Sequence, residues 1–348
     1  SDDNDGLRNG SVITLVNLRL RDACGVRTLD SVPAENLDEC LDNVIEAFSL
    51  QEGVNDIRAF VARLRRQEDP ALINLGMRLF HSKSLSQNNA TACSSCHHPS
   101  LGCGGDGLSL PIGVNADNPD LLGPGRTDGN TVPLVPRHSP HLCNSALWVD
   151  SMFWDQRIVT EDFRTSAVGE VSTQAIRTPE LDVTRSLAEE VDSSDPLRLL
   201  IAQAHFPVTA AEEMGDTTGF DSPQSYRNHI ATKLTTDWAD DFKEVYGSEE
   251  VTFMRTARAL AAYEAAFLFI DNPFFDYIDG NRDSLTEDEK RGALFFYTGA
   301  GCANCHDGAF FSPDRTRPPL YPQIGANAVG DGNNQQQFRM PSLLNIGI

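Results

Sequence analysis

The feature that most constrains this 348-residue chain is a pair of C-x-x-C-H motifs, C-S-S-C-H at residues 93–97 and C-A-N-C-H at residues 302–306. Two thiols three positions apart can meet the two vinyl groups of a haem, and the histidine that follows can place its imidazole beneath the iron. The motifs therefore predict two covalently bound c-type haems. The competing interpretation is a four-thiolate zinc site, for which both thiol pairs would have to converge in space. The predicted haem-binding residues are Cys93, Cys96, His97, Cys302, Cys305 and His306.

The length of the chain is sufficient for two compact domains, which allows one haem motif in each. Apolar residues recur at helical spacing in residues 37–50 and 54–65. A capping box at residues 286–289 predicts a helix that leads into the second motif. Residues 101–140 are dense in Gly, Pro, Asn and Asp and are expected to form long loops.

The predicted fold is mainly α-helical, with two cytochrome c-like haem domains, long loops and an N-terminal extension. We expect the extension at residues 1–70 and the first haem domain at residues 71–223, with an insertion at about 157–200. The second haem domain is expected at residues 224–348.

The net charge of the chain limits the kinds of molecule that it is expected to bind. Lys and Arg number 28 against 50 Asp and Glu, a formal charge of -22. Such a surface repels phosphate backbones and anionic membranes, so nucleic acid is not an expected partner, whereas a basic small electron-carrier cytochrome is compatible. The most apolar stretch, residues 257–270, is interrupted by Arg258, Tyr263 and Glu264, so no membrane span is expected.

Four cysteines remain outside the motifs. An even number in an oxidising compartment predicts two disulfides, Cys24 with Cys40 and Cys103 with Cys143, and the alternative is buried free thiols. Haem attachment to C-x-x-C-H occurs outside the bacterial cytoplasm, which predicts a periplasmic or otherwise secreted protein. The first residues lack a basic region followed by an apolar stretch, so an export signal is expected to have been removed already.

Several segments around the motifs form a recognisable pattern. They are L-G-M-R-L-F at residues 75–80, P-I-G-V at 111–114, R-H-S-P at 137–140, F-W-D-Q-R at 153–157, and F-R-M-P-S-L at 338–343. In these segments the chain resembles the bacterial di-haem cytochrome c peroxidase family, which includes the MauG-type enzymes. The resemblance covers about residues 71–348 and does not extend to the first seventy residues.

The resemblance implies that hydrogen peroxide reacts at the first haem and that the second haem transfers electrons. In family members that need activation, the segment similar to residues 111–114 ends in a histidine that blocks the sixth position of the first iron. Val114 stands there in this chain. Because valine cannot bind iron, we expect a five-coordinate haem that is open to peroxide, as in MauG-type members. The alternative is that another histidine, above all His205, reaches the iron.

The resemblance also assigns catalytic residues. The acid-base glutamate of the family falls on Glu213, which would take a proton from one peroxide oxygen and deliver it to the other. Gln203, ten residues earlier, would orient peroxide or Glu213. Glu180 is the alternative acid if the insertion is aligned differently. Trp154 corresponds to the family tryptophan that relays electrons between the haems, although a large aromatic residue is more often plain core.

Two further positions depart from the family. Family members continue beyond the F-R-x-P-S-L segment to a Met or Tyr ligand of the second haem, and here Met340 is the nearest candidate, with an ordinary core methionine as the alternative. The family's interdomain calcium site has an asparagine ligand where this chain has His138. Calcium prefers oxygen ligands, so calcium is possible but doubtful.

Together these features predict an oxidoreductase that reduces or uses hydrogen peroxide at the first haem and passes electrons through the second. The expected electron source is a small donor cytochrome. One alternative is MauG-like oxidation of a partner protein. Another is a non-catalytic di-haem electron carrier in which both irons are six-coordinate.

Overall fold

The computed structural model describes residues 18–102, 104–129, 135–161, 174–312 and 339–346, and these residues are mainly helical, as the sequence predicted. The helices are α1 (Leu20–Cys24), α2 (Leu37–Ala47), α3 (Leu50–Arg66), α4 (Pro70–His81), α5 (Cys93–Cys96), α6 (Leu181–Glu190), α7 (Arg198–Gln203), α8 (Pro223–Tyr246), α9 (Phe253–Ala265), α10 (Pro273–Ile278) and α11 (Glu287–Leu294). Three short strands, β1 (Ser151–Met152), β2 (Ile158–Thr160) and β3 (Ile176–Arg177), form an antiparallel sheet in that order.

The starts of the longer helices follow from local chemistry. The Asp69 carboxylate accepts hydrogen bonds from the first free N–H groups of α4, and proline is the first residue of that helix. Ser222 caps α8 in the same way, again before a proline. The predicted capping box of α11 is confirmed, since Thr286 and Glu289 exchange hydrogen bonds. A π-helical turn, Phe295–Gly299, carries the chain from α11 to the second motif.

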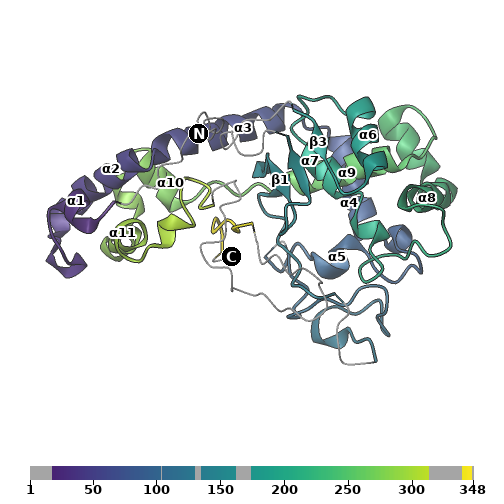
Figure 1. Ribbon diagram of the computed structural model, residues 1–348, viewed down its shortest axis with the longest axis horizontal. Coiled ribbons are helices and arrows are strands. Elements are labelled where there is room, and N and C mark those ends of the chain that lie inside the picture. Colours follow the sequence, from purple (N-terminus) through teal and green to yellow (C-terminus); the bar gives the residue numbers. More distant parts are fainter. Residues whose placement is uncertain (1–17, 103, 130–134, 162–173, 313–338, 347–348) are drawn as a thin grey trace, which may run out of the picture.

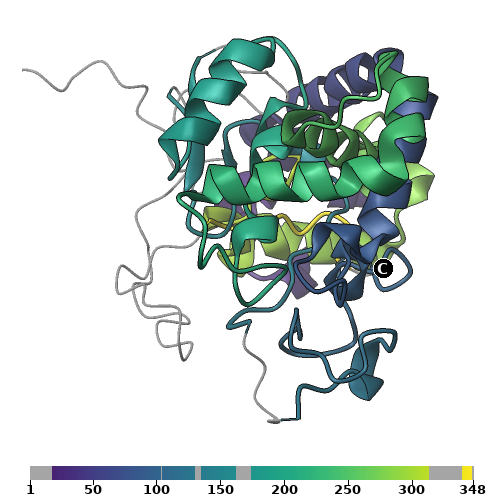
Figure 2. The same ribbon diagram turned by 90° about the vertical axis from the view of Figure 1, so that its right-hand side faces the viewer.

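The molecule has two lobes (Figure 1). One lobe contains α1, α2, α10 and α11 and leads into the second haem motif. The other contains α4 to α9, the sheet and the first motif on α5. Helix α3 runs along one edge from the lobe of the second motif toward the larger lobe, which contains the first motif. Below the helices of the larger lobe, loops of residues 97–102 and 104–129 project to one side, in agreement with the predicted loop region (Figure 2).

The larger lobe is built on the packing of α4 against α9. At Gly76 the two backbones approach so closely that a Cβ atom would lie 1.9 Å from the Ala259 carbonyl oxygen. Only glycine permits this approach. Helix α8 packs beside α4 and α9, and α7 packs on α9 and against β1 and β2. In this way α4, which leads to the first motif, is fixed from several sides.

The described part of the N-terminal extension, residues 18–70, packs against the lobe of the second motif. Helix α2 lies on α11, and α3 lies on α10. The predicted Cys24–Cys40 disulfide is present and joins α1 to α2. Polar contacts between residues far apart in the sequence reinforce this packing. The Tyr277 hydroxyl donates to Asp38, 2.7 Å away, and Arg282 forms an ion pair with Asp42. The second predicted disulfide involves Cys103, which lies outside the described residues.

The domain limits expected from the sequence stay a prediction, and the packing favours a modification. Helices α8 and α9 lie within residues 224–348, yet both pack against α4 of the larger lobe. A boundary near residue 270, before α10, agrees better with these contacts. Among the described residues, no helix is long and apolar enough to cross a membrane.

Candidate haem sites

The first motif forms one helical turn. Helix α5 spans the two thiols, and neither Cys93 nor Cys96 is in a disulfide. The His97 Nδ1 atom lies 2.9 Å from the Pro140 carbonyl oxygen and is placed to donate to it, which leaves Nε2 available as a metal ligand. Burial lowers the pKa of His97 to about 4, so its imidazole is neutral at physiological pH.

The second motif repeats this arrangement in the other lobe. A 3₁₀ turn, Cys302–Asn304, carries the first thiol, and neither Cys302 nor Cys305 is in a disulfide. The His306 Nδ1 atom lies 3.1 Å from the Phe311 carbonyl oxygen. Both histidines thus use one ring nitrogen on a backbone carbonyl and keep the other for iron. Since the thiol pairs lie in different lobes, they do not form one four-thiolate site (Figure 1).

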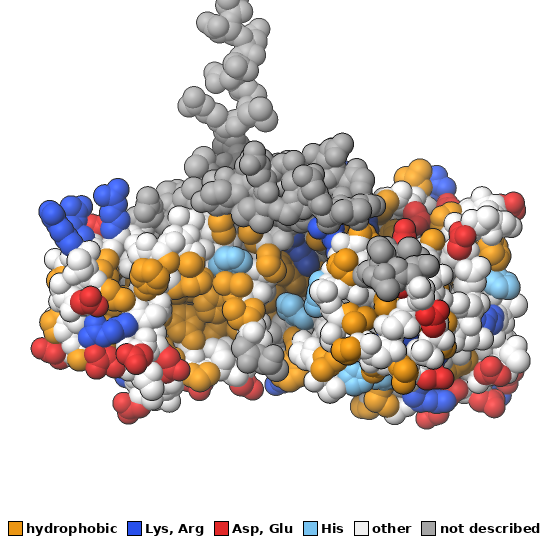
Figure 3. Space-filling model, turned by 90° about the horizontal axis from the view of Figure 1, so that it is seen from below, with side chains coloured by type: hydrophobic (Ala, Val, Ile, Leu, Met, Phe, Trp, Pro, Cys, Tyr) orange, Lys and Arg blue, Asp and Glu red, His pale blue; other side chains and the backbone are white. Residues whose placement is uncertain are grey.

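The surroundings of the second motif fit a haem. The lobe of α1, α2, α10 and α11 has a hollow lined by hydrophobic side chains, as an apolar porphyrin face requires (Figure 3). In that lobe the buried Tyr297 hydroxyl has no hydrogen-bond partner among the described residues. Such a hydroxyl is normally satisfied, and a haem propionate could accept its hydrogen bond.

Glu213 lies beside the first motif. Burial raises the pKa of the Cys93 and Cys96 thiols, and the negative charge of Glu213 adds to this rise, so the carboxylate lies within electrostatic range of both thiols. Desolvation raises the pKa of Glu213 to about 7, with Arg157 opposing this rise and Glu212 adding to it, although part of the side chain remains exposed. A carboxyl with this pKa can both accept and return a proton at neutral pH.

The loop that ends in Val114 packs on the turn that holds Glu213. A Cβ atom at Gly113 would lie 2.0 Å from the Glu212 carbonyl oxygen, so the two backbones are in direct contact. The buried Arg126 guanidinium fixes the loop by donating to the carbonyl oxygens of Ile112, at 2.7 Å, and Gly113, at 2.9 Å. The structure thus brings the two predicted determinants of the peroxide site, Val114 and Glu213, to neighbouring segments.

The two alternatives to these residues differ: Glu180 is paired elsewhere, whereas the hydrogen bond of His205 uses only its Nδ1 atom. Glu180 forms a bidentate ion pair with the buried Arg227, with N–O distances of 2.8 and 2.9 Å. That pairing leaves it poorly suited to proton transfer at a haem. His205 is buried with its ring against Phe253, 5.3 Å between centroids, and its Nδ1 is 2.7 Å from the Ile201 carbonyl oxygen.

The remaining predicted residues occupy three places. Gln203 is the last residue of α7, and its assigned role stays a prediction. Trp154 lies under the Arg137 guanidinium, 3.9 Å from the ring centre, and its carbonyl accepts from the Arg339 N–H. The Met340 carbonyl accepts from the Ser312 hydroxyl, so the segment of Met340 runs beside the loop that follows the second motif. Its role as an iron ligand remains a prediction.

Two residues near the first motif were missed from the sequence. Arg157 belongs to the F-W-D-Q-R segment, and its positive charge acts on Glu213. Glu264, on α9, is only 7% exposed, and burial raises its pKa to about 8 while its charge acts on Cys93. The available signal for Glu264 was its position inside an otherwise apolar stretch, where an acid is costly unless it is protonated.

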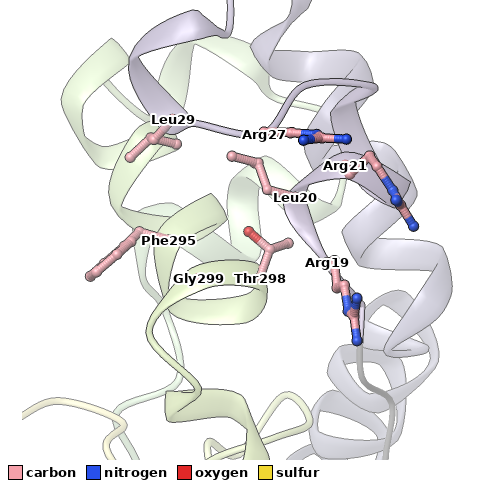
Figure 4. A pocket seen from close by; sticks show the side chains of 8 residues that line it. All are labelled: Arg19, Leu20, Arg21, Arg27, Leu29, Phe295, Thr298 and Gly299. Carbon is pink, nitrogen blue, oxygen red and sulfur yellow. The ribbon is translucent and has the colours of Figure 1, made fainter.

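A cavity of about 420 Å³ lies apart from these residues, between α1 and the π-helical turn before the second motif. Arginine side chains line one side and apolar side chains the other (Figure 4). Its lining residues are Arg19, Leu20, Arg21, Arg27, Leu29, Phe295, Thr298 and Gly299.

Comparison with known proteins agrees with this arrangement. The family model of the di-haem cytochrome c peroxidases, CCP_MauG, matches residues 70–283, more than half of the chain. The chain therefore belongs to the di-haem cytochrome c peroxidase family and is a haem-binding oxidoreductase. The match includes the first motif and ends before the second.

Two relatives illustrate the range of the family. The cytochrome c551 peroxidase of Nitrosomonas europaea is 25% identical over 290 residues, which cover 80% of this chain and 67% of that protein. The methylamine utilization protein MauG of Methylorubrum extorquens is 27% identical over 299 residues, which cover 83% of this chain and 65% of that protein. The chain thus spans about two thirds of the length of these relatives.

A crystal structure of a MauG-like protein associated with microbial copper homeostasis has a similar fold. Its TM-score is 0.50 at 22% sequence identity, over 81% of this chain and 71% of that chain. This likeness supports the mainly α-helical cytochrome c-like fold.

Proposed function

We propose that this chain uses hydrogen peroxide at a haem held by Cys93, Cys96 and His97, and that a second haem held by Cys302, Cys305 and His306 supplies electrons. A haem bound at the first site would provide the redox chemistry that splits the O–O bond. The protein would provide attachment, orientation and proton transfer. The observation that carries the proposal is the placement of Glu213, with a pKa near 7, against the loop that ends in Val114.

Glu213 has a definite task in this proposal. As a carboxylate it takes the proton from the bound peroxide, and as a carboxylic acid it returns that proton to the departing oxygen, so that water leaves. A pKa near 7 allows both steps near neutral pH. Arg157 keeps the carboxylate form accessible because its positive charge opposes the effect of burial. Gln203 would orient peroxide or Glu213.

The finer assignments belong to the same proposal. Thioether attachment through all four thiols implies export to the periplasm or beyond. Trp154 would relay electrons, and Met340 is the candidate sixth ligand of the second haem. Calcium stays doubtful because His138 occupies the position of an oxygen ligand. The electron donor would be a small cytochrome.

A second candidate is oxidation of a partner protein, the alternative that the resemblance to MauG-type enzymes implies. Val114 favours it, because a first haem without a blocking histidine would need no prior reduction by a donor. The two candidates share the same first site. They differ in whether electrons come from a reduced cytochrome or from side chains of a partner.

The test is a spectroscopic titration of the oxidised holoprotein with hydrogen peroxide. We expect a high-spin ferric component that disappears on addition of peroxide, and its recovery by a reduced small cytochrome would distinguish the peroxidase from the second candidate. Two purely low-spin haems that do not respond to peroxide would overturn the proposal and leave an electron carrier.

A further inference from the structure

The two proximal histidines are each anchored to a segment that leads to the same interlobe contact. His97 bonds to the carbonyl of Pro140, and the chain continues from there to Trp148. His306 bonds to the carbonyl of Phe311, the neighbour of Phe310. Trp148 and Phe310 meet edge to face, with ring centroids 4.8 Å apart. Trp148 directly follows the turn Ser145–Leu147, which packs on α9, and Phe310 follows the second motif, so this ring contact joins the two lobes.

Both partners of this contact are rigidly held. Trp148 is 6% exposed and Phe310 is 1% exposed. The segment before Trp148 is fixed by Asn144, whose backbone and side chain bond to the backbone of residues 267 and 269. The Phe310 carbonyl accepts from the Ser342 hydroxyl, 2.6 Å away. Close, fixed contacts between packed side chains shorten the gaps that an electron must tunnel across.

The Arg339 guanidinium lies on the Trp148 indole and makes oxidation of that indole less favourable. Arg339 lies with its central carbon 3.7 Å from the centre of the Trp148 ring and is held by hydrogen bonds to the carbonyls of Ser151 and Trp154. A cation on the ring face stabilises the neutral indole and disfavours a positive charge on it. Trp148 is therefore suited to mediating a single tunnelling step, in which the indole itself is not oxidised.

We propose that Trp148, through its contact with Phe310, is an electron relay residue between the two haems, in addition to the predicted Trp154. The inference rests on the proposed function, since it needs haems at both motifs. One electron leaves the reduced second haem and arrives at the oxidised first haem. No bond forms or breaks, and the indole keeps its proton.

The chain offers a matched set of variants, because an arginine side chain lies over the ring of each of its three tryptophans. Arg339 covers Trp148, Arg137 covers Trp154, and Arg78 lies 5.2 Å from the ring of Trp238. Trp238 is 9% exposed on α8, away from the contact between the lobes. Trp238→Phe is therefore the control for loss of a buried indole.

The experiment injects one electron into the oxidised holoprotein by pulse radiolysis and follows how fast that electron equilibrates between the two haems. We expect Trp148→Phe to slow transfer by about tenfold, which corresponds to about 1.4 kcal/mol in the activation barrier. Haem content, spectra and both reduction potentials should stay as in the wild type. Trp238→Phe should transfer at the wild-type rate. Equal slowing in both variants would overturn the proposal, as would an unchanged rate in Trp148→Phe.

A second variant keeps the proposal testable if Trp148→Phe fails to fold. Phe310→Leu removes the contact from the other side and leaves the indole in place. It should slow transfer similarly, and the double variant should be no slower than either single variant, because both changes interrupt one contact. Additive slowing would overturn the proposal. The measurement uses no peroxide, so failure of the proposed peroxide chemistry would leave its outcome readable.

Discussion

The two haem motifs have the same proximal geometry and different surroundings. In both, the histidine Nδ1 bonds to a backbone carbonyl, and the thiols are free for attachment. Around the first motif lie two acids whose pKa values are raised to about 7 and about 8 by burial, Glu213 and Glu264. Around the second lies a set of packed aromatic rings. These are Phe48, Phe274, Phe296, Tyr297 and Phe311.

The comparison teaches that the motif determines the cofactor and its neighbours determine the chemistry. A proton-handling acid beside an open haem supports reactions in which bonds to oxygen break. A shell of aromatic rings excludes water and holds its haem in fixed geometry, which suits electron transfer alone. The difference is testable because the distinguishing residues can be changed without touching either motif.

The largest expected effect comes from removing the acid of the first site. Glu213→Gln should slow the reaction with peroxide by about a hundredfold or more, because an amide cannot take the proton from peroxide. Stopped-flow mixing with peroxide measures the rate, and haem content should be unchanged. Glu212→Gln, the same chemical change at the adjacent exposed position, is the matched control and should react at close to the wild-type rate. Equal rates in the two variants would show that Glu213 is not the acid.

The next effect concerns the lobe of the second motif. Replacing Cys24 and Cys40 by Ala opens the disulfide between α1 and α2, which spans 16 positions of sequence. The free energy of unfolding should fall by about 2–3 kcal/mol, since the unfolded chain gains conformational freedom. Denaturant unfolding followed at each haem band provides the measurement. The loss should appear at the second haem, and a loss confined to the first haem would contradict the placement of the extension.

Much of the fold could be predicted because its signals are local. The spacing of Val54, Ile57 and Leu64 predicted a helix that is observed as α3, and the capping residues of α11 are as expected. The association of the extension with α10 and α11 was not predictable. It depends on pairs such as Asp38 with Tyr277, and one acid among 50 carries no mark of its distant partner.

The site divides in the same way. The four thiols and two histidines could be predicted as haem-binding residues from spacing alone, whereas the prediction for Glu213 needed the family resemblance. Glu264 looked like an ordinary polar interruption of α9, because burial and pKa are properties of the folded chain. Trp148 lies between two segments that carry the family resemblance, residues 137–140 and 153–157. Its proposed role depends on its contact with Phe310, more than a hundred residues away in the chain.

A smaller effect distinguishes the two motifs through pH. The pKa of Glu213 is raised to about 7, so the fraction of carboxylate falls as pH drops below 7. Because the carboxylate takes the proton from peroxide, the rate should be constant above pH 7 and fall about tenfold for each pH unit below it. Stopped-flow mixing between pH 5.5 and 8.5 measures the profile. Glu213→Gln should lose this dependence, and an identical profile in that variant would assign the titration to another group.

The smallest effect compares two buried tyrosine hydroxyls, one in each lobe. In the second lobe the Tyr277 hydroxyl donates to Asp38 of the extension, at 2.7 Å. Tyr277→Phe should therefore cost about 1 kcal/mol in the free energy of unfolding, the usual net contribution of one hydrogen bond. In the first lobe the Tyr226 hydroxyl is buried and has no partner among the described residues, so Tyr226→Phe should cost less or stabilise the protein.

Denaturant unfolding of both variants, with the second haem as the probe for Tyr277→Phe, gives the comparison. Each change removes one oxygen atom from a side chain of equal size, so packing terms cancel and the polar contacts of the Tyr277 hydroxyl, with Asp38 of the extension and with Arg282, remain as the difference. A double variant with Asp38→Asn tests the assignment further. If the Tyr277 bond is what ties the extension to α10, the two changes should couple, and strictly additive costs would mean that α2 is held to its lobe by other contacts.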